Sequence, residues 1–126
     1  MTIPAPCGVI TQNDGAVILA LAGELDLATA PEARALAALA HDEAAAGARK
    51  LLVIDLRAIT FLASMGLELL ADQRSRAART GVAIALVATT RAVTRVLDIA
   101  GLTAQFVSCA DVESALTSSK LPPAES

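Results

Sequence analysis

Short apolar runs separated by turn residues open the sequence. Two of them, residues 8–11 and 16–21, flank the segment Gln12-Asn13-Asp14-Gly15. Asp-Gly is a strong signal for a tight hairpin, because both residues readily adopt positive φ. We therefore predict an antiparallel strand pair whose first strand lies at the edge of a sheet. Residues 22–27 should lead away from the second strand as a loop.

After residue 28 the apolar positions change to helical spacing. Thr29 to Glu32 matches a capping box with Pro31 in the first turn, which indicates the start of a helix. Gly47 marks its end. Apolar residues then recur on one helical face. They are Ala33, Leu36, Ala37, Ala40 and Ala44.

The rest of the chain alternates apolar runs with helical patterns. The apolar runs, which are typical of buried strands, are residues 51–55, 82–87 and 105–108. The helical patterns are residues 64–79, 90–100 and 111–117. In the first of these helices, we expect inward-facing side chains at Leu67, Leu70, Ala71 and Ala78. The alternation favours parallel pairing through right-handed crossovers. We predict an α/β fold in which helices pack on a mixed β-sheet with an edge antiparallel hairpin and parallel βαβ units.

Composition and charge limit the functional classes. The 126 residues fit one domain, and a hydrophobic content of 55% is ample for its core. A net charge of −3 gives no bulk attraction to nucleic acid or to an anionic membrane. No export signal and no run long enough to span a membrane are evident. We expect a cytoplasmic domain over residues 7–118, with a flexible leader at 1–6 and a flexible tail at 119–126.

Motifs for hydrolytic or redox catalysis are absent. There is no phosphate-binding glycine loop, no HExxH and no CxxC. His41 is the only histidine and falls on the polar side of its helix, so we expect it to be solvated and not catalytic. Cys7 and Cys109 lack metal-ligand spacing and are expected to be reduced thiols, with a redox disulfide as the less favoured reading. We therefore predict a protein that is no enzyme and needs no cofactor or metal.

Three carboxylates lie near predicted loop ends, at Glu24, Asp26 and Asp55. They allow an acid/base pair or a Mg²⁺ site, but structural or partner-facing roles are favoured. Ser64 falls where a predicted loop becomes a helix. A serine there can cap backbone N–H groups, and a phosphate there would meet the positive end of the helix dipole.

Three segments together resemble the STAS-domain family of bacterial anti-sigma factor antagonists. They are Gly23-Glu24-Leu25-Asp26 with Thr29-Ala30, then Asp55-Leu56 through Phe61 to Ser64-x-Gly66-Leu67, and Arg95-Val96-Leu97-Asp98-Ile99-Ala100-Gly101-Leu102. The resemblance implies a STAS-type fold and a partner-switching cycle of the stress-response kind. In that cycle the unmodified antagonist binds an anti-sigma factor, a GHKL-type serine kinase, and so releases a sigma factor. The kinase phosphorylates a serine of the antagonist with ATP, and a serine phosphatase resets the cycle.

The resemblance assigns the phosphorylated serine to Ser64. It places partner-binding residues at Glu24, Asp26, Thr29, Ala63, Met65, Gly66 and Leu67. Two positions depart from the family pattern, because Ala63 replaces the usual acid and Met65 replaces a small hydroxyl residue. Met65 adds a large, adaptable apolar side chain to the expected contact surface. Gly66 would let another backbone approach closely.

Two other functions stay open at this stage. One is a STAS protein-interaction module without phosphoregulation, such as a scaffold or a transport accessory subunit, in which Ser64 is a plain N-cap. The other is a nucleotide or small-molecule sensor, or a weak enzyme, that uses Asp26 and Asp55. Exposed edge strands are compatible with a monomer or a weak dimer.

Overall fold

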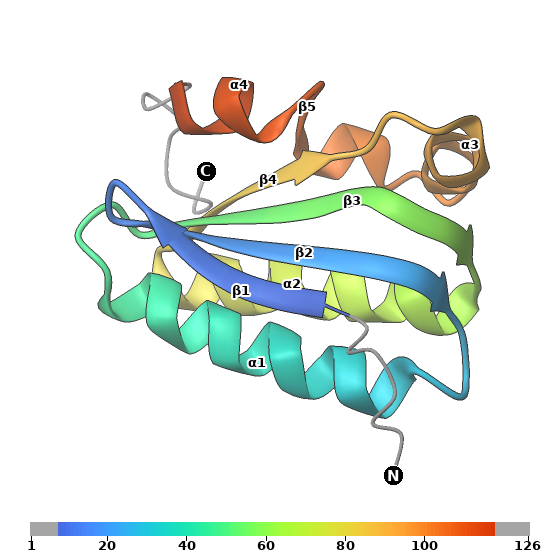
Figure 1. The fold of residues 1–126 in the computed structure, drawn as a ribbon, viewed down its shortest axis with the longest axis horizontal. Coiled ribbons are helices and arrows are strands. Elements are labelled where there is room, and N and C mark those ends of the chain that lie inside the picture. The colour runs from blue at the N-terminus through green and yellow to red at the C-terminus, as the bar shows by residue number, and fades with distance from the viewer. Residues whose placement is uncertain (1–7, 118–126) are drawn as a thin grey trace, which may run out of the picture.

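The computed structural model describes residues 8–117 as a five-stranded sheet with helices on both faces (Figure 1). The strands are β1 (Gly8–Asn13), β2 (Ala16–Leu25), β3 (Leu51–Leu62), β4 (Ala83–Val87) and β5 (Val107–Cys109). They lie side by side in that order; β1 is antiparallel to β2, and the other neighbours are parallel. The mixed sheet predicted from the sequence is confirmed. The leader, the tail and Cys7 lie outside the described residues.

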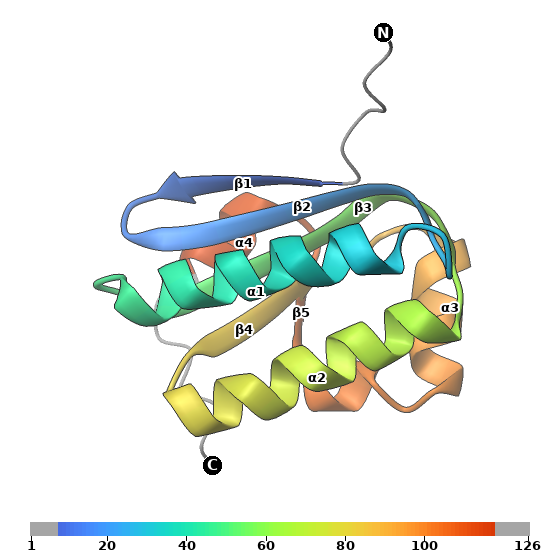
Figure 2. The same cartoon turned by 90° about the horizontal axis from the view of Figure 1, so that it is seen from below.

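The helices are α1 (Ala30–Ala46), α2 (Ser64–Thr80), α3 (Arg91–Ile99) and α4 (Val112–Thr117), with a 3-10 turn η1 (Thr103–Gln105). α1 and α2 cover one face of the sheet, and α4 lies over the other (Figure 1). α3 lies beside the second half of β3, where β4 has already ended (Figure 2). Within residues 8–117, no helix combines the length and the apolar character that crossing a bilayer requires.

The hairpin between β1 and β2 forms as predicted. Asp14 and Gly15 take φ values of +54° and +82°, which is the left-handed backbone that a two-residue hairpin turn of this kind requires. β1 is the edge strand, also as predicted. Local turn chemistry alone therefore determines this end of the sheet.

β2 and β3 are both longer than their apolar runs indicate. The sequence predicts that β2 ends at Leu21 and β3 at Asp55, but β2 continues to Leu25 and β3 to Leu62. Their extra residues pair with each other, and the register shifts twice along the way. Gly23, with φ of +84°, lies at the second shift, where a left-handed backbone favours glycine. The predicted loop at residues 22–27 is therefore mostly strand.

Two apolar clusters form the core, one on each face of the sheet. The larger lies under α1, α2 and α3 and includes Leu19, Leu21, Leu52, Ile54, Leu69 and Leu70. The smaller lies under α4 and includes Ile18, Leu51, Val53 and Val87. Buried alanines on α1, among them Ala33, Ala37 and Ala40, confirm the predicted inner face of that helix.

The predicted inner face of α2 is partly wrong. Ala71 and Ala78 are exposed, whereas Leu69, Gln73 and Ala77 are buried along with Leu70. The helix is rotated so that the larger side chains of Leu69 and Leu70 both reach the core. Small alanines remove little apolar area from water, so they fix the orientation of a helix weakly.

His41 is buried, with 1% of its surface exposed, and the prediction of a solvated histidine is wrong. Gln73 Oε1 on α2 can only accept, so His41 Nδ1 donates to it at 3.2 Å. His41 Nε2 lies 2.8 Å from Thr80 Oγ1. Burial lowers the pKa of His41 below its ordinary value of 6.5. The neutral ring therefore joins α1 to α2.

Candidate functional site

The carboxyl ends of β2 and β3 and the amino ends of α1 and α2 meet at one end of the sheet (Figure 1). The backbone N–H of Ala63 donates to the carbonyl of Leu25 at 3.0 Å, which joins the end of β3 to the end of β2. Just before this hydrogen bond, Glu24 of β2 and Phe61 of β3 are paired in the strand register. The long strand pair thus places the segment around Asp26 beside the segment around Ser64.

Asp26 and Thr29 stabilise the loop between β2 and α1. The hydroxyl of Thr29 donates to the carbonyl of Glu24 at 2.7 Å and accepts the backbone N–H of Asp26 at 3.0 Å. Asp26 Oδ1 accepts the backbone N–H groups of Ala28 and Thr29 at 3.0 and 3.2 Å. Thr29 is the N-cap of α1, as the capping-box pattern predicts, but its side chain makes no cap bond to the first turn, so that part of the prediction is wrong. Its hydroxyl faces back toward β2 because the extended strand brings the Glu24 carbonyl within reach.

Ser64 is the first residue of α2 and is exposed. The N-cap is Ala63, whose carbonyl accepts the N–H groups of Gly66 at 2.9 Å and Leu67 at 3.3 Å. The reading of Ser64 as a plain N-cap is therefore wrong. Among residues 8–117, the Ser64 hydroxyl has no hydrogen-bond partner, and no side chain caps the first turn. The fold leaves this hydroxyl available and leaves the positive end of α2 without a side-chain acceptor.

Gly66 is buried beneath the ends of β2 and β3. A Cβ at this position would meet Leu62 Cδ1 at less than contact distance and would lie 3.0 Å from Leu25 Cδ2. The absence of a side chain therefore lets α2 pack on its own strands. The internal packing alone accounts for a glycine at this position.

Two exposed apolar side chains lie on the segments that lead into α1 and α2, and they were not predicted as site residues. Leu27 is 74% exposed in the loop after β2, and Phe61 is 51% exposed near the end of β3. Met65 and Leu67, on the first turn of α2, are half-buried. Large apolar side chains that stay exposed next to polar groups often mark interaction surfaces. In the sequence, nothing distinguishes Leu27 from the other apolar residues of this segment, Leu25 and Ala28.

The remaining carboxylate of interest, Asp55, is held in a structural ion pair. Its two oxygens accept Arg57 Nε at 3.0 Å and Arg57 Nη2 at 2.9 Å. Arg57 is exposed on the sheet face. Within residues 8–117, no three side chains of His, Cys, Asp or Glu are grouped to hold a metal. With Asp26 engaged by backbone N–H groups, the arrangement favours structural roles for both carboxylates.

Cys109 in β5 is half-buried and is a free thiol. Its burial, with a smaller contribution from Asp111, raises the pKa of the thiol. A thiol of raised pKa is a poor nucleophile at neutral pH.

Comparison with known proteins identifies relatives over nearly the whole chain. The profile of the STAS domain family matches residues 9–115. The crystal structure of an anti-sigma factor antagonist from Mycobacterium paratuberculosis superimposes with a TM-score of 0.80 and 27% sequence identity, covering 94% of this chain and 99% of that one. No curated protein matches the sequence significantly.

Two further structures share the fold at lower sequence identity. One is a putative anti-sigma factor antagonist from Thermotoga maritima, with a TM-score of 0.77, 19% identity, and coverage of 90% of this chain and 94% of that one. The other is the phosphorylated form of the Bacillus cell fate determinant SpoIIAA, with a TM-score of 0.65, 18% identity, and coverage of 88% and 97%.

Proposed function

This chain belongs to the STAS domain family, and from that premise we propose that it is an anti-sigma factor antagonist controlled by phosphorylation of Ser64. Its partner is an anti-sigma factor of the GHKL serine kinase type, which it binds through the surface around the start of α2, so that a sigma factor is released. A serine phosphatase reverses the modification. The antagonist from Mycobacterium paratuberculosis, similar over nearly its full length, supports the proposal.

The exposed Ser64 hydroxyl at the first residue of α2 is the observation that carries the proposal. A kinase can reach it without unfolding α2, because no described residue engages it. The residue before the serine, where the family usually has an acid, is Ala63, and it is the N-cap of α2. An acid there would itself accept first-turn N–H groups; with alanine, those groups are free to stabilise a phosphate on Ser64.

Phosphorylation would change the same surface that the partner covers. A phosphoserine adds about −1.5 to −2 charges at neutral pH. The charge is tolerated at the positive end of α2 but not in an interface that buries it. The exposed carboxylate of Glu24 lies on the neighbouring segment and adds like-charge repulsion to a second negative group. The kinase therefore dissociates from the modified antagonist.

Leu27 and Phe61 supply the apolar contacts of this interface. They lie on the two segments joined by the hydrogen bond between Ala63 and Leu25, and both are well exposed. Met65 on α2 extends the same surface. Binding energy in such interfaces is concentrated in a few large apolar side chains surrounded by polar groups.

The decisive experiment uses the purified kinase, ATP and the full chain. We expect wild type, but not Ser64→Ala, to gain the mass of one phosphate. Ser64→Glu should weaken kinase binding about tenfold or more, because it places a charge in the interface. Ser75→Glu is the matched control, since it adds the same charge about three turns further along α2. The regulated function is excluded if no phosphate is gained and if Ser64→Ala and Ser64→Glu bind alike.

The alternative function is a STAS interaction module without phosphoregulation. For such a module we expect no added phosphate and equal binding by Ser64→Ala and Ser64→Glu. Met65 favours it, because a large side chain next to the serine changes the surface that a kinase would have to recognise. Truncation of the exposed apolar side chains of Leu27 and Phe61 tests partner binding under either function, regulated or unregulated. Leu27→Ala and Phe61→Ala should each weaken the complex, whereas Leu39→Ala, which removes a similarly exposed leucine from α1, should not.

A further inference from the structure

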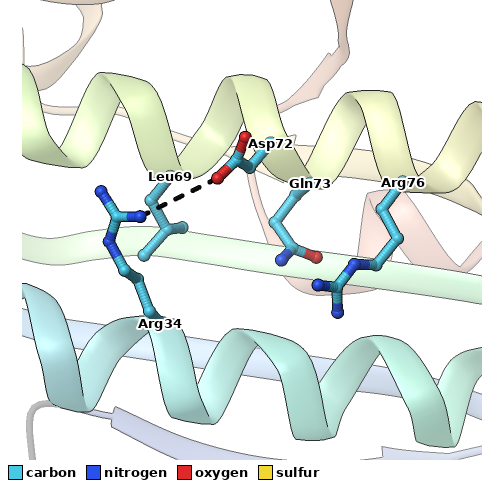
Figure 3. Close-up of a pocket in the computed structure, with 5 residues that line it drawn as sticks. All are labelled: Arg34, Leu69, Asp72, Gln73 and Arg76. Carbon is cyan, nitrogen blue, oxygen red and sulfur yellow. Dashed lines mark ion pairs between the residues drawn. The ribbon is translucent and has the colours of Figure 1, made fainter.

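A small cavity lies between α1 and α2, away from Ser64. Its volume is about 220 Å³, and its lining consists of Arg34 from α1 and Leu69, Asp72, Gln73 and Arg76 from α2 (Figure 3). The side chains from the two helices point toward one another across this space (Figure 3). The cavity belongs to no part of the surface described above.

Gln73 is a buried polar group directed into this cavity, with 4% of its surface exposed. Its Oε1 accepts from His41 Nδ1, which fixes the orientation of the amide. The amide nitrogen has no hydrogen-bond partner within residues 8–117, and it lies on the cavity side (Figure 3). Within residues 8–117 no fully buried side-chain nitrogen or oxygen lacks a partner, so this N–H₂ group is reached by solvent from the cavity, where a ligand can accept from it.

Arg76 supplies a second donor group. It is partly buried at the cavity, and its guanidinium makes no ion pair with any residue that the structure describes. An arginine offers a planar fork of N–H groups that matches phosphate or carboxylate oxygens. An unpaired guanidinium next to a buried amide donor favours an anionic ligand.

Arg34 is the third donor and is held only loosely. Its guanidinium lies 3.5 Å from Glu68 Oε1 and 3.9 Å from Asp72 Oδ2, and all three side chains are well exposed. Exposed ion pairs at such distances contribute little to stability. Arg34 can therefore turn toward a ligand without a large loss.

We propose that this cavity binds a compact phosphoryl anion, either inorganic phosphate or the phosphate of a small monoester. Gln73 and Arg76 extend toward it from successive turns of α2, and Arg34 extends from α1 on the facing side (Figure 3). Donors from two facing helices suit a tetrahedral anion better than a planar carboxylate. The cavity is smaller than the roughly 300–1,000 Å³ of pockets for drug-sized ligands, so a whole nucleotide does not fit.

Asp72 gives the site a characteristic charge dependence. Its carboxylate lines the cavity and repels an anion, while its contact with Arg34 is long. Asp72→Asn should therefore strengthen phosphate binding severalfold. For a ligand with an ammonium group, Asp72→Asn should instead weaken binding.

Calorimetric titration and amide NMR of the full chain test this site. The probes are inorganic phosphate, glycerol phosphate, sulfate and malate at matched ionic strength, in chloride buffer. Phosphate and glycerol phosphate should bind saturably and shift the side-chain amide signals of Gln73. Arg76→Gln should weaken phosphate binding about tenfold or more, because a charge-assisted hydrogen bond is lost. Arg95→Gln, which removes an exposed arginine from α3, is the matched control and should leave binding unchanged.

Three results would overturn the proposal: no saturable shift at Gln73, equal losses in Arg76→Gln and Arg95→Gln, or malate binding as tightly as phosphate. Binding of inorganic phosphate without glycerol phosphate identifies the free ion as the ligand; binding of both identifies the phosphoryl group. The site does not depend on Ser64, so Ser64→Ala should bind phosphate as wild type does.

Discussion

His41 and Gln73 place a polar contact inside the otherwise apolar interface of α1 and α2. The ring is buried, and its two nitrogens lie within hydrogen-bond distance of Gln73 and Thr80. Burial is the main cause of its lowered pKa; Arg76 and Arg79 lower it further, whereas the Gln73 hydrogen bond and Asp42 oppose the shift. The fold therefore holds the neutral ring, and protonation favours the unfolded chain.

The stability that neutral His41 contributes should be lost in mild acid. Because the pKa is lower in the folded than in the unfolded chain, the contribution is complete above pH 6.5 and declines as the pH falls through the folded-state pKa. We expect wild type to be more stable than His41→Gln near neutral pH. The difference in free energy of unfolding should shrink as the pH falls below 6.5. Urea denaturation at several pH values measures it, and a constant or growing difference would contradict the prediction.

At the scale of elements, the Thr29 hydroxyl joins the two ends of the loop between β2 and α1, and Asp26 Oδ1 accepts two N–H groups within it. Thr29 Oγ1 joins the carbonyl of Glu24 to the N–H of Asp26, so it fixes the end of β2 relative to the start of α1. The loop carries Leu27, one of the two exposed apolar side chains of the proposed interface. Its conformation therefore links stability to recognition.

Two substitutions at Thr29 separate the effect of its hydroxyl group from the effect of its methyl group. Thr29→Val keeps the shape but removes hydrogen bonds to two backbone groups that water can partly reach, which should cost about 0.5–1.5 kcal/mol in the free energy of unfolding. Thr29→Ser retains the hydroxyl and should lose much less. Chemical denaturation of both variants gives the comparison, and equal losses would show that the methyl group, not the hydroxyl, stabilises the loop.

At the scale of the whole molecule, the fold gathers its candidate surface from segments that are distant in the sequence. The ends of β2 and β3 pair with each other, and α2 follows β3 after one residue, Ala63. Ser64 contributes no side-chain bond to this arrangement within residues 8–117. A modification of Ser64 should therefore alter recognition without altering the fold.

The Ser64→Glu variant tests this independence directly. Its free energy of unfolding should stay within about 0.5 kcal/mol of wild type, the usual range for a surface substitution. A small gain is expected, since a carboxylate in the first turn of α2 meets the positive end of the helix dipole. Urea denaturation at neutral pH supplies the value. A loss above about 1 kcal/mol would mean that the serine supports the fold after all.

Patterns that act locally were predicted correctly from the sequence. The Asp14-Gly15 turn, the parallel strand–helix alternation and the helix end at Gly47 depend on residues close in the chain. The extension of β2 and β3 could not be predicted in this way. In these extensions polar or small residues (Ala22, Gly23, Glu24, Arg57, Ala58 and Thr60) interrupt the apolar pattern. The segments become strand because each supplies the hydrogen-bond partners of the other, across two register shifts.

The sequence by itself determined the mixed α/β fold, the STAS resemblance and the position of Ser64 at the start of a helix. Only the tertiary structure decided which neighbours each of these residues meets. It buried His41 against Gln73, turned Thr29 toward β2, placed Gly66 under Leu25, and left Leu27 and Phe61 exposed. The physical reason is that apolar periodicity fixes which face of an element is buried, whereas the partner of a polar or small side chain is set by an element distant in the sequence.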